Sequence, residues 1–301
     1  MGFRTVVVKS RCKLEHRLNY LVIRGEDERR IFLSEINVLI VQSTAVSLTA
    51  ALLSELVKNN VKVIFCDEKF NPHSELTPYY GAHNTSKRYK MQAMWEKEDK
   101  DEIWRIIITR KILNQSEVLY KNGFYEEAEL LKTYAAEVVP ADVTNREGHA
   151  AKVYFKRILP DGCSRKDNVF LNGCLNYGYA VLLSLFNREI TASGYLTQFG
   201  IWHNNEFNQF NLSSDLMEPM RPFIDEIALS VGNGDKDFKR KMAEILNYKA
   251  ESGGKSTTFD IAVRQYVKSV FCAIECKDFS FITFPQNVTP VVEQSQTKAD
   301  E

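Results

Sequence analysis

The chain has 301 residues, which is more than one hydrophobic core usually serves, so we expect two folded domains. Hydrophobic residues make up 44% and charged residues 26%, a balance typical of a globular protein rather than a disordered one. Lysine plus arginine equals aspartate plus glutamate at 39 each, so the overall charge gives no reason to expect a nucleic-acid partner. Any DNA-binding surface must therefore be local.

The start of the chain lacks the apolar core and small-residue cleavage site of a signal peptide. The most apolar stretch, residues 36–53, is interrupted by Asn37, Gln42 and Ser47 and is too polar for a membrane span of about 20 residues. We therefore expect a cytoplasmic protein without a membrane segment.

The six cysteines lie at positions 12, 66, 163, 174, 272 and 276 and include no C-x-x-C pair. This spacing excludes a zinc ribbon and a thioredoxin-like motif. An even number could form a disulfide framework, but a chain of this length has enough core without one. We expect reduced cysteines within the core.

The first 66 residues contain short runs rich in β-branched residues, and their spacing predicts antiparallel strands. The runs are 5–8, 20–23, 30–33, 38–41 and 61–65. Leu48, Leu52 and Leu56 have helical spacing and predict one helix over 46–58, which Asn59 and Asn60 end. We therefore predict an N-terminal β-rich domain over residues 1–80, with its connection to the next domain within 71–83.

Beyond residue 83 apolar residues recur every three or four positions, which predicts a C-terminal all-α domain over residues 84–286. The predicted helices are 86–97, 102–121, 125–137, 146–159, 169–187, 223–230, 238–246 and 258–273. The polar residues 287–301 show no periodicity, and we expect them to form a disordered tail. The predicted fold class is α+β.

Glu147 is the first candidate for a functional residue. On a helix it shares a face with Ala151, Tyr154 and Ile158, and a carboxylate among such neighbours needs a cation, a metal or a proton. The alternative is structural, because Thr144 and Glu147 have the spacing of a capping box. Both interpretations remain open from the residues alone.

A second group of candidates is His203 with Asp215 and Glu218, the latter two being three residues apart and able to share a helix face. Pro219 and Pro222 lack amide protons and place this segment at a helix start or a kink. The structural alternative is that Asp215 caps the helix, Glu218 favours its dipole and His203 is a packing residue.

One imidazole with two or three carboxylates suits Mg²⁺ or Mn²⁺, which also keep waters or substrate phosphate oxygens. Such a metal offsets charge on a phosphate and lowers the pKa of a bound hydroxyl or water. The donor set therefore indicates phosphodiester chemistry, although no fixed spacing defines such a site.

Three motifs occur in order: Asn145-Arg-Glu-Gly-x-Ala-Ala-x-x-Tyr-Phe, Leu171-Asn-x-x-Leu-Asn-Tyr-Gly-Tyr, and His203 followed by Asp215-Leu-Met-Glu-Pro-Met-Arg-Pro. Together they resemble the CRISPR-associated integrase family called Cas1. The length and the Asp-Leu-Met-Glu-Pro form look most like the type II branch, which accompanies Cas9.

The resemblance implies a homodimeric, metal-dependent endonuclease and integrase that inserts captured double-stranded DNA into a CRISPR array with a small partner, Cas2. Other type II adaptation proteins are further expected partners. Glu147, His203 and Glu218 fall on the family's three metal-ligand positions, and Asp215 falls on a supporting acidic position. The third ligand is often aspartate in the family, so Glu218 leaves the metal geometry open.

The resemblance also places the helix that carries Asn172, Asn176, Tyr177 and Tyr179 under the active site, although both tyrosines fit core packing. Basic side chains could follow DNA phosphates, but in a neutral chain most belong to the solvated surface. These basic positions are 87, 88, 90, 105, 110, 111 and 239–241.

We therefore expect an enzyme that transfers a DNA 3′-hydroxyl onto a phosphodiester of the array. One alternative is a structure-selective nuclease, which uses the same metal with water as the nucleophile. The other is a DNA-binding scaffold without catalysis, in which Glu147 caps a helix and His203 packs. Metal titration separates the scaffold from the two enzymes.

Overall fold

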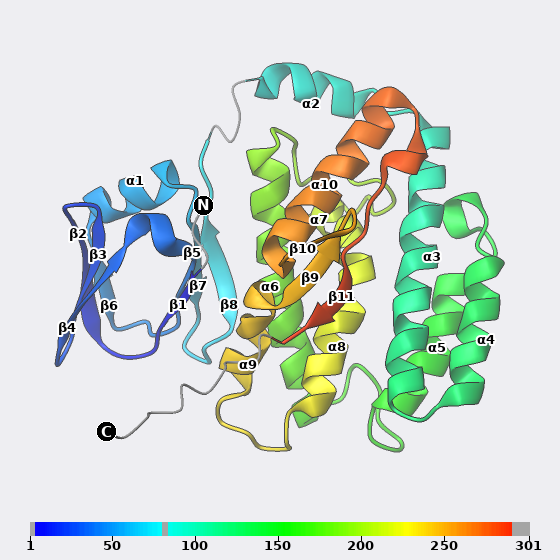
Figure 1. Cartoon of the computed structure of the whole chain (residues 1–301), viewed down its shortest axis with the longest axis horizontal. Helices are drawn as coiled ribbons and strands as arrows, with labels where there is room; N and C mark the ends of the chain where they lie inside the picture. The colour runs from blue at the N-terminus through cyan, green and yellow to red at the C-terminus, as the bar shows by residue number, and fades with distance from the viewer. Residues whose placement is uncertain (1–3, 80–83, 291–301) are drawn as a thin grey trace, which may run out of the picture.

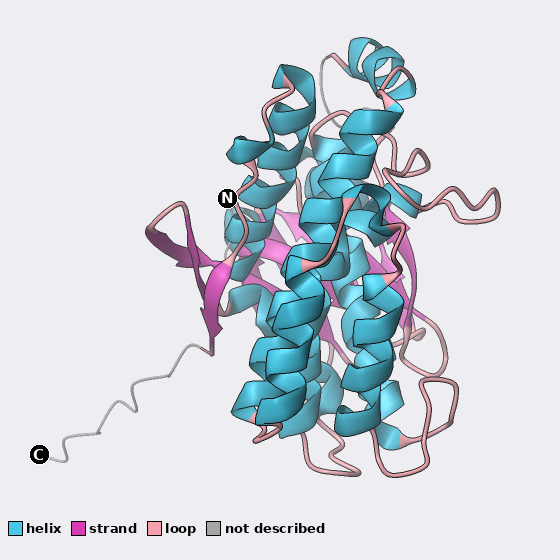
Figure 2. Ribbon diagram, turned by 90° about the vertical axis from the view of Figure 1, so that its right-hand side faces the viewer, coloured by secondary structure: helices cyan, strands magenta, loops and turns pink. Residues whose placement is uncertain are grey.

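A computed structural model of the chain describes residues 4–79 and 84–290. The fold is α+β, with a β-rich N-terminal unit on one side and a larger, mainly helical unit on the other (Figure 1). The long helices of the second unit run side by side as a bundle (Figure 2). No helix within the described ranges is long and apolar enough to cross a bilayer.

The N-terminal unit consists of two four-stranded sheets and helix α1. One sheet has the order β1 (Arg4–Val8), β5 (Ile36–Val41), β7 (Lys62–Cys66), β8 (Pro72–Leu76). The other has the order β4 (Glu28–Phe32), β3 (Tyr20–Arg24), β2 (Cys12–Arg17), β6 (Val46–Leu48). All five predicted strands are present, and β2, β6 and β8 are additional.

The prediction of antiparallel strands is correct for β3 and β4, which pair with each other, but wrong for β1, β5 and β7, which pair in parallel. Parallel neighbours need a crossover connection, and here the second sheet connects β1 to β5 while α1 connects β5 to β7. Residue spacing along the chain does not reveal this arrangement.

Strands β5 and β7 are buried on both faces, which explains the apolar runs 38–41 and 63–66 within them. Leu39 and Val63 face α1 and the second sheet, whereas Ile40 and Ile64 pack against the helices. Because side chains alternate along a strand, one sheet serves both hydrophobic cores. The first sheet therefore lies between the core of the N-terminal unit and the core of the helical unit.

Helix α1 (Ala50–Lys58) begins four residues later than predicted. The Thr49 hydroxyl accepts a hydrogen bond from the Leu52 amide and caps the helix, and the preceding residues form β6 beside β2. Leu52 and Leu56 are fully buried, as their spacing indicates.

The helical unit is organised around α3, which packs against α4, α5 and α8, and around α6, which packs against α7 to α10. The helices are α2 (Thr85–Ala93), α3 (Lys97–Lys121), α4 (Tyr125–Ala136), α5 (Arg146–Ile158), α6 (Phe170–Ala192), α7 (Asn211–Met217), α8 (Arg221–Ser230), α9 (Phe238–Glu244) and α10 (Phe259–Cys276). The predicted helices are present, with ends shifted by up to five residues.

The expectation of an all-α C-terminal domain is wrong in one place, because a three-stranded sheet lies beside α10 (Figure 1). Strands β9 (Lys249–Ser252) and β10 (Lys255–Thr258) form a hairpin. Its turn is made by Gly253 and Gly254, whose φ angles of +56° and +74° suit a two-residue hairpin turn. The turn was visible in the sequence, but the hairpin was not.

The third strand is β11 (Gln286–Thr289). The predicted disordered tail over 287–301 is therefore wrong for residues 287–289. Strand β11 pairs antiparallel with β9, so backbone hydrogen bonds order it although three of its four side chains are exposed. A strand with mostly exposed side chains gives no hydrophobic pattern. The rest of the predicted tail, residues 291–301, lies outside the described residues.

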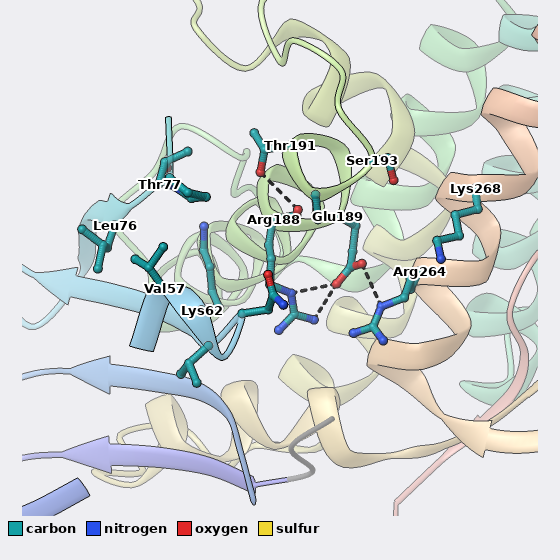
Figure 3. Close-up of a pocket in the computed structure, with 14 residues that line it drawn as sticks. Val57, Lys62, Leu76, Thr77, Arg188, Glu189, Thr191, Ser193, Arg264 and Lys268 are labelled. Carbon is teal, nitrogen blue, oxygen red and sulfur yellow. Dashed lines mark hydrogen bonds and ion pairs between the residues drawn. The ribbon is translucent and has the colours of Figure 1, made fainter. Parts of the chain in front are cut away.

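A buried polar network joins the first sheet to α6 and α10, and Figure 3 shows the part that links Arg188 and Glu189 of α6 to Arg264 of α10. Arg188 donates to Asn37 Oδ1 at 2.7 Å, and Asn37 donates to Asp260 Oδ2 at 2.5 Å. The Glu189 carboxylate accepts from Arg188 and from Arg264, at 2.7 and 2.9 Å. These residues lie at or beside a cavity of about 240 Å³, and they fix how the sheet sits on the bundle.

All six cysteines are free, as expected for reduced residues. Cys66 and Cys174 are buried, but Cys272 and Cys276 are exposed on α10, so placing every cysteine in the core was wrong. The two exposed residues lie at helical spacing on the outer side of an amphipathic helix.

Candidate functional site

Glu147 lies at the beginning of α5, and a strained loop sets its position. Ala141, Asp142 and Asn145 have φ angles of +60°, +44° and +53°, in the left-handed region that residues with a side chain rarely adopt. The Asp142 carboxylate accepts hydrogen bonds from the amides of Arg146 and Glu147 at 2.8 and 2.9 Å. Asp142 therefore fixes the first turn of α5, a role the sequence did not suggest.

The capping-box interpretation of Thr144 and Glu147 is wrong. The residue that caps α5 is Asn145, whose side chain accepts from the Gly148 amide at 3.3 Å. The Glu147 carboxylate points away from this turn and accepts a hydrogen bond from Lys111 at 2.5 Å. Its side chain is 30% exposed, so it lies at the edge of the core.

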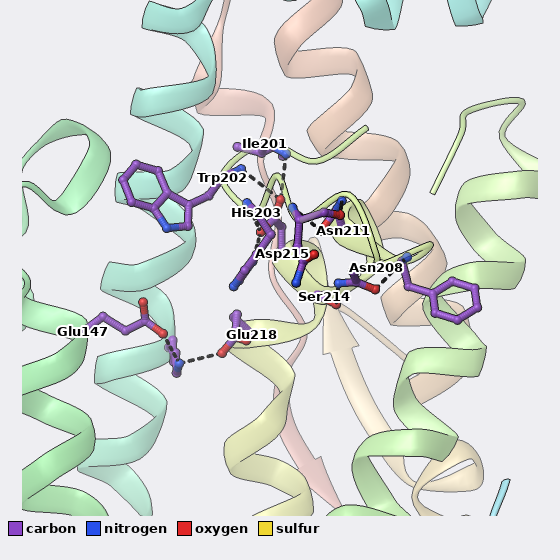
Figure 4. A network of polar contacts seen from close by, with 12 residues as sticks. Glu147, Ile201, Trp202, His203, Asn208, Asn211, Ser214, Asp215 and Glu218 are labelled. Carbon is purple, nitrogen blue, oxygen red and sulfur yellow. Dashed lines mark hydrogen bonds and ion pairs between the residues drawn. The ribbon is translucent and has the colours of Figure 1, made fainter. Parts of the chain in front are cut away.

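Lys111, in the middle of α3, brings Glu147 and Glu218 together. Its Nζ lies 2.5 Å from Glu147 Oε1 and 2.6 Å from Glu218 Oε2. Figure 4 shows the two glutamates reaching toward each other from opposite sides, with His203 pointing toward Glu218. Lys111 was grouped with surface bases, but it is 10% exposed and lies at the centre of the site.

Glu218 lies where α7 turns through a short 3₁₀ segment, Glu218–Met220, into α8. Proline in this segment makes the kink that the sequence predicted, and the Asn114 amide satisfies the Pro219 carbonyl at 2.7 Å. Arg221 pairs with Glu218 Oε1 at 3.0 Å. Burial alone would raise the pKa of Glu218, but Lys111 and Arg221 outweigh it and hold the pKa below its usual value.

The charge of Lys111 is equally well compensated. Burial alone would lower the pKa of its ammonium group, but the Glu218 and Glu147 carboxylates outweigh this effect and raise the pKa above the usual value. Lys111 is therefore a permanent cation between two carboxylates at neutral pH.

Asp215 orients His203. Its fully buried carboxylate accepts from the amides of Ile201, Trp202 and His203 at 2.7, 2.9 and 3.1 Å. It also bonds His203 Nδ1 at 2.5 Å, which leaves Nε2 as the nitrogen that faces outward. The bond to Asp215 raises the pKa of the His203 imidazole above its usual value, and the nearby Glu218 and Glu147 carboxylates act in the same direction.

Trp104 of α3 supports the His203 loop from the other side. Its buried indole stacks on Trp202, with ring centroids 5.6 Å apart, and meets the His203 ring edge-on at 5.8 Å. The imidazole is therefore held between a carboxylate and an indole while 44% of its side chain stays exposed. A fixed orientation combined with an exposed side chain is typical of a ligand histidine rather than of one that fills the core.

A layer of buried polar residues lies beneath Glu218. Arg221 packs on the Tyr179 ring, 4.8 Å from its centroid, and Asp225 accepts from Tyr179 and Tyr154 at 2.5 and 2.8 Å. Burial raises the pKa of Asp225 to about 6, against the hydrogen bonds of both tyrosines. Core packing, the expected role of both tyrosines, fits Tyr177, which packs against Phe238. Tyr179 in addition donates to Asp225 and packs against Arg221.

The other predicted residues lie apart from this cluster. Asn176 accepts from Arg165 at 2.8 Å, and Asn172 also bonds Arg165. Among the basic positions, Arg88 pairs with Glu275 and Lys241 pairs with Asp235. These ion pairs neither support nor exclude DNA contacts, which stay a prediction.

The structure thus brings Glu147 and Glu218 to one point, places His203 beside them and puts Asp215 behind His203. The sequence analysis missed Asp142, Arg221 and the role of Lys111. Lys111 had a signal, because it continues the apolar stripe of Trp104, Ile107 and Ile108 at helical spacing. Arg221 also had one, because it stands in the third motif, three residues after Glu218.

The cluster fits a hard divalent cation. Within the described ranges no three histidine, cysteine or acidic side chains are close enough to enclose a metal ion. Even so, one cationic nitrogen already binds an oxygen of Glu147 and an oxygen of Glu218, and the His203 side chain points toward Glu218 (Figure 4). Two carboxylates and one imidazole are ligands that Mg²⁺ or Mn²⁺ accepts.

Comparison with known proteins gives a consistent result. Residues 5–251 match the sequence profile of the family described as CRISPR associated protein Cas1. A curated relative from Neisseria meningitidis, named CRISPR-associated endonuclease Cas1, is 35% identical over 301 residues, which cover 97% of this chain and 99% of the relative.

Two solved structures have a similar fold. A casposase bound to an integration product has a TM-score of 0.73 at 19% identity, covering 92% of this chain and 91% of that one. A Cas6-RT-Cas1–Cas2 complex has a chain with a TM-score of 0.73 at 17% identity, covering 93% of this chain and 36% of that one. At these identities the likeness concerns the fold.

Proposed function

Because the chain belongs to the family of CRISPR-associated protein Cas1, we propose that it is a metal-dependent DNA integrase that inserts captured DNA into a CRISPR array. The observation that carries the proposal is the convergence of Glu147 and Glu218, from separate helices, on one cation position beside His203. Further support comes from the casposase of similar fold, which is described as bound to an integration product.

Glu147, His203 and Glu218 would hold Mg²⁺ or Mn²⁺. Such an ion, when bound, polarises a phosphate oxygen and lowers the pKa of a hydroxyl group. Asp215 keeps Nδ1 of His203 engaged, so that Nε2 is the nitrogen presented to the site. Arg221 holds the second oxygen of Glu218 and thereby fixes the direction in which this carboxylate points.

The reaction is a transesterification. The 3′-hydroxyl oxygen of captured DNA attacks a phosphorus atom of the array, a new P–O bond forms, and the broken strand leaves as a 3′-hydroxyl. The chain contributes by positioning the incoming end, because a bound hydroxyl competes with water through its high effective concentration. In the nuclease alternative, water takes the place of that hydroxyl.

The proposed partners are double-stranded DNA, a second copy of the chain and a Cas2 protein, with other type II adaptation proteins as further candidates. Support for Cas2 comes from the similar fold of a chain in a Cas6-RT-Cas1–Cas2 complex. We assign dimerisation to the β-rich residues 1–80, catalysis to residues 84–286, and the reaction to the cytoplasm. Light scattering that gives a monomer at micromolar concentration would contradict the homodimer.

The deciding experiment changes the incoming DNA and leaves the protein alone. Labelled DNA with a 3′-hydroxyl is incubated with a plasmid carrying a CRISPR array, in Mg²⁺, Mn²⁺ or chelator. We expect joined product only with metal, and none from DNA ending in a 3′-phosphate or a dideoxynucleotide. Both blocked DNAs should still bind, since backbone phosphates supply most of the affinity. If the plasmid is cut equally well with blocked ends and labelled ends never become joined, the nuclease alternative is correct.

Variants test the site residues in the same assay. Glu147→Gln, His203→Ala and Glu218→Gln should each abolish joining while the protein still binds DNA. Glutamine is the better replacement at Glu218, because alanine would leave the buried Lys111 without this partner and destabilise the fold by about 3–5 kcal/mol. If Glu147→Gln joins DNA at the wild-type rate, Glu147 is not a residue of the active site.

A further inference from the structure

Lys111 is a cation that the sequence analysis did not assign to the site, and it occupies the central position of the cluster. It comes from α3, whereas Glu147 lies in the first turn of α5 and Glu218 directly follows α7. Its Nζ lies 2.5 Å from Glu147 Oε1 and 2.6 Å from Glu218 Oε2, so three helices meet on one ammonium group. With side-chain exposures of 10% for Lys111 and 6% for Glu218, water screens this contact weakly.

We propose that Lys111 is a built-in counter-ion, which holds Glu147 and Glu218 together in the metal-free protein and which a divalent ion displaces when it binds. Metal binding would then be an exchange of one cation for another. The inference rests on the proposed function, because it assumes that Mg²⁺ or Mn²⁺ binds these two carboxylates.

Space makes the two cations mutually exclusive. Mg²⁺ binds oxygen ligands at about 2.0–2.1 Å, so an ion that takes Glu147 Oε1 and Glu218 Oε2 needs the volume where the Lys111 ammonium lies. The two positive charges would also repel each other strongly in a buried site. The ammonium group therefore has to leave these two oxygens before the metal can use them.

The site has one cation suited to leave and one suited to stay. The lysine side chain is a flexible four-carbon chain that can swing its ammonium to another position. Arg221, in contrast, packs its planar guanidinium on the Tyr179 ring at 4.8 Å while it holds Glu218 Oε1 at 3.0 Å. Exchange at Glu218 Oε2 therefore leaves Glu218 anchored through its other oxygen.

The exchange has a measurable consequence for metal affinity. A ligand that binds only a minor state has an apparent affinity reduced by the population of that state. The structure places Lys111 in the paired position, and we infer that this position is the major state of the metal-free protein. If the open position is populated at about 10% or less, removing the lysine tightens metal binding by about tenfold or more.

The experiment is an Mn²⁺ titration followed by electron paramagnetic resonance, in which the signal of free hexaaquo Mn²⁺ falls as the protein binds it. It compares the wild type with Lys111→Met, which removes the charge, and with Lys111→Arg, which keeps it. Lys121→Met is the matched control, because Lys121 lies on the same helix and pairs with Glu226 at 2.8 Å on the surface. We expect at least about tenfold tighter binding for Lys111→Met and no tightening for the other two.

Thermal unfolding separates this role from a purely structural one. In chelator, Lys111→Met should melt below the wild type, because Glu147 and Glu218 lose their shared cation. In saturating Mn²⁺ it should regain most of the loss, so its metal-dependent rise in melting temperature exceeds that of the wild type. A lysine with only a structural role would lower the melting temperature equally in both conditions. If Lys111→Met is insoluble, Lys111→Gln replaces it in both measurements.

The outcomes distinguish the inference from the function it rests on. Suppose that the wild type binds Mn²⁺, that His203→Ala loses this binding, and that Lys111→Met binds Mn²⁺ equally well or more weakly than the wild type. This result overturns the proposal that Lys111 is a displaced counter-ion and leaves the proposed metal site intact. If the wild type shows no Mn²⁺ binding that depends on His203, both the counter-ion role of Lys111 and the proposed metal site are overturned.

Discussion

We expect Asp225 to make this protein less stable as the pH rises, and Asp225→Asn should abolish that effect. Burial raises the pKa of Asp225 to about 6, whereas the unfolded chain titrates near the ordinary value of 3.8. Between about pH 4 and 6 the folded protein therefore binds the additional proton, so stability falls as the pH increases through this window. A difference of about two pKa units corresponds to about 3 kcal/mol at 1.36 kcal/mol per unit.

Asparagine is a suitable replacement because it is neutral at every pH and has nearly the same shape. Its carbonyl oxygen accepts from the Tyr179 hydroxyl, and its amide can donate to the Tyr154 hydroxyl, so both contacts of the native carboxylate have counterparts. The variant should match or fall slightly below the wild type at pH 4.5. By pH 7 its free energy of unfolding should have improved relative to the wild type by about 2–3 kcal/mol.

The assay is urea unfolding at several pH values between 4.5 and 7, followed by tryptophan fluorescence. All three tryptophans, at positions 95, 104 and 202, lie in the helical unit that contains Asp225. The difference between variant and wild type isolates this one group, because the remaining groups titrate in both proteins. A difference that stays constant across the range would show that Asp225 is ionised in the folded protein throughout, and the assigned burial effect would be wrong.

Asp215→Ala removes an acceptor for three backbone amides, and urea unfolding should show a loss of about 3–5 kcal/mol; a loss below about 1 kcal/mol would contradict the role assigned to it. Gly178→Ala places a Cβ against the Ile224 side chain where α6 crosses α8, and the unfolding free energy should fall by about 1–3 kcal/mol. Gly173→Ala is its control on the same helix, with no atom within 4 Å, and should gain up to about 1 kcal/mol because alanine favours the helix. Equal effects of the two glycine substitutions would refute the close approach of α6 and α8.

Local sequence signals were sufficient to predict many of the helices and strands and the family of this protein. Leu52 and Leu56 predicted α1 because helical periodicity depends only on neighbouring residues. The strand-like runs and helical periodicity predicted the α+β fold, and the ordered motifs around Glu147, His203 and Glu218 predicted the Cas1 family, which is confirmed. The metal-ligand roles of these three residues stay a prediction.

Other features depended on contacts between distant segments. Nothing in the local sequence distinguishes a parallel β5 from an antiparallel one, because direction is decided by where the crossover connections pass. Strand β11 is ordered by backbone hydrogen bonds to β9, which leave no pattern in its side chains.

The contacts at the centre of the site depend on tertiary packing and could not be predicted from the sequence. Lys111 is 36 residues from Glu147 in sequence, and its place on the apolar stripe of α3 indicates burial but not which carboxylates it meets. Asp215 was expected beside the site, but its four contacts with residues 201–203 exist only because that loop folds over the start of α7. Residue types and local spacing are properties of the chain, so the sequence was enough to predict Glu147, His203 and Glu218 as candidate ligands. Packing of α3 against α5 and α8 decided which charges meet, because electrostatic interaction depends on distance in space and on burial.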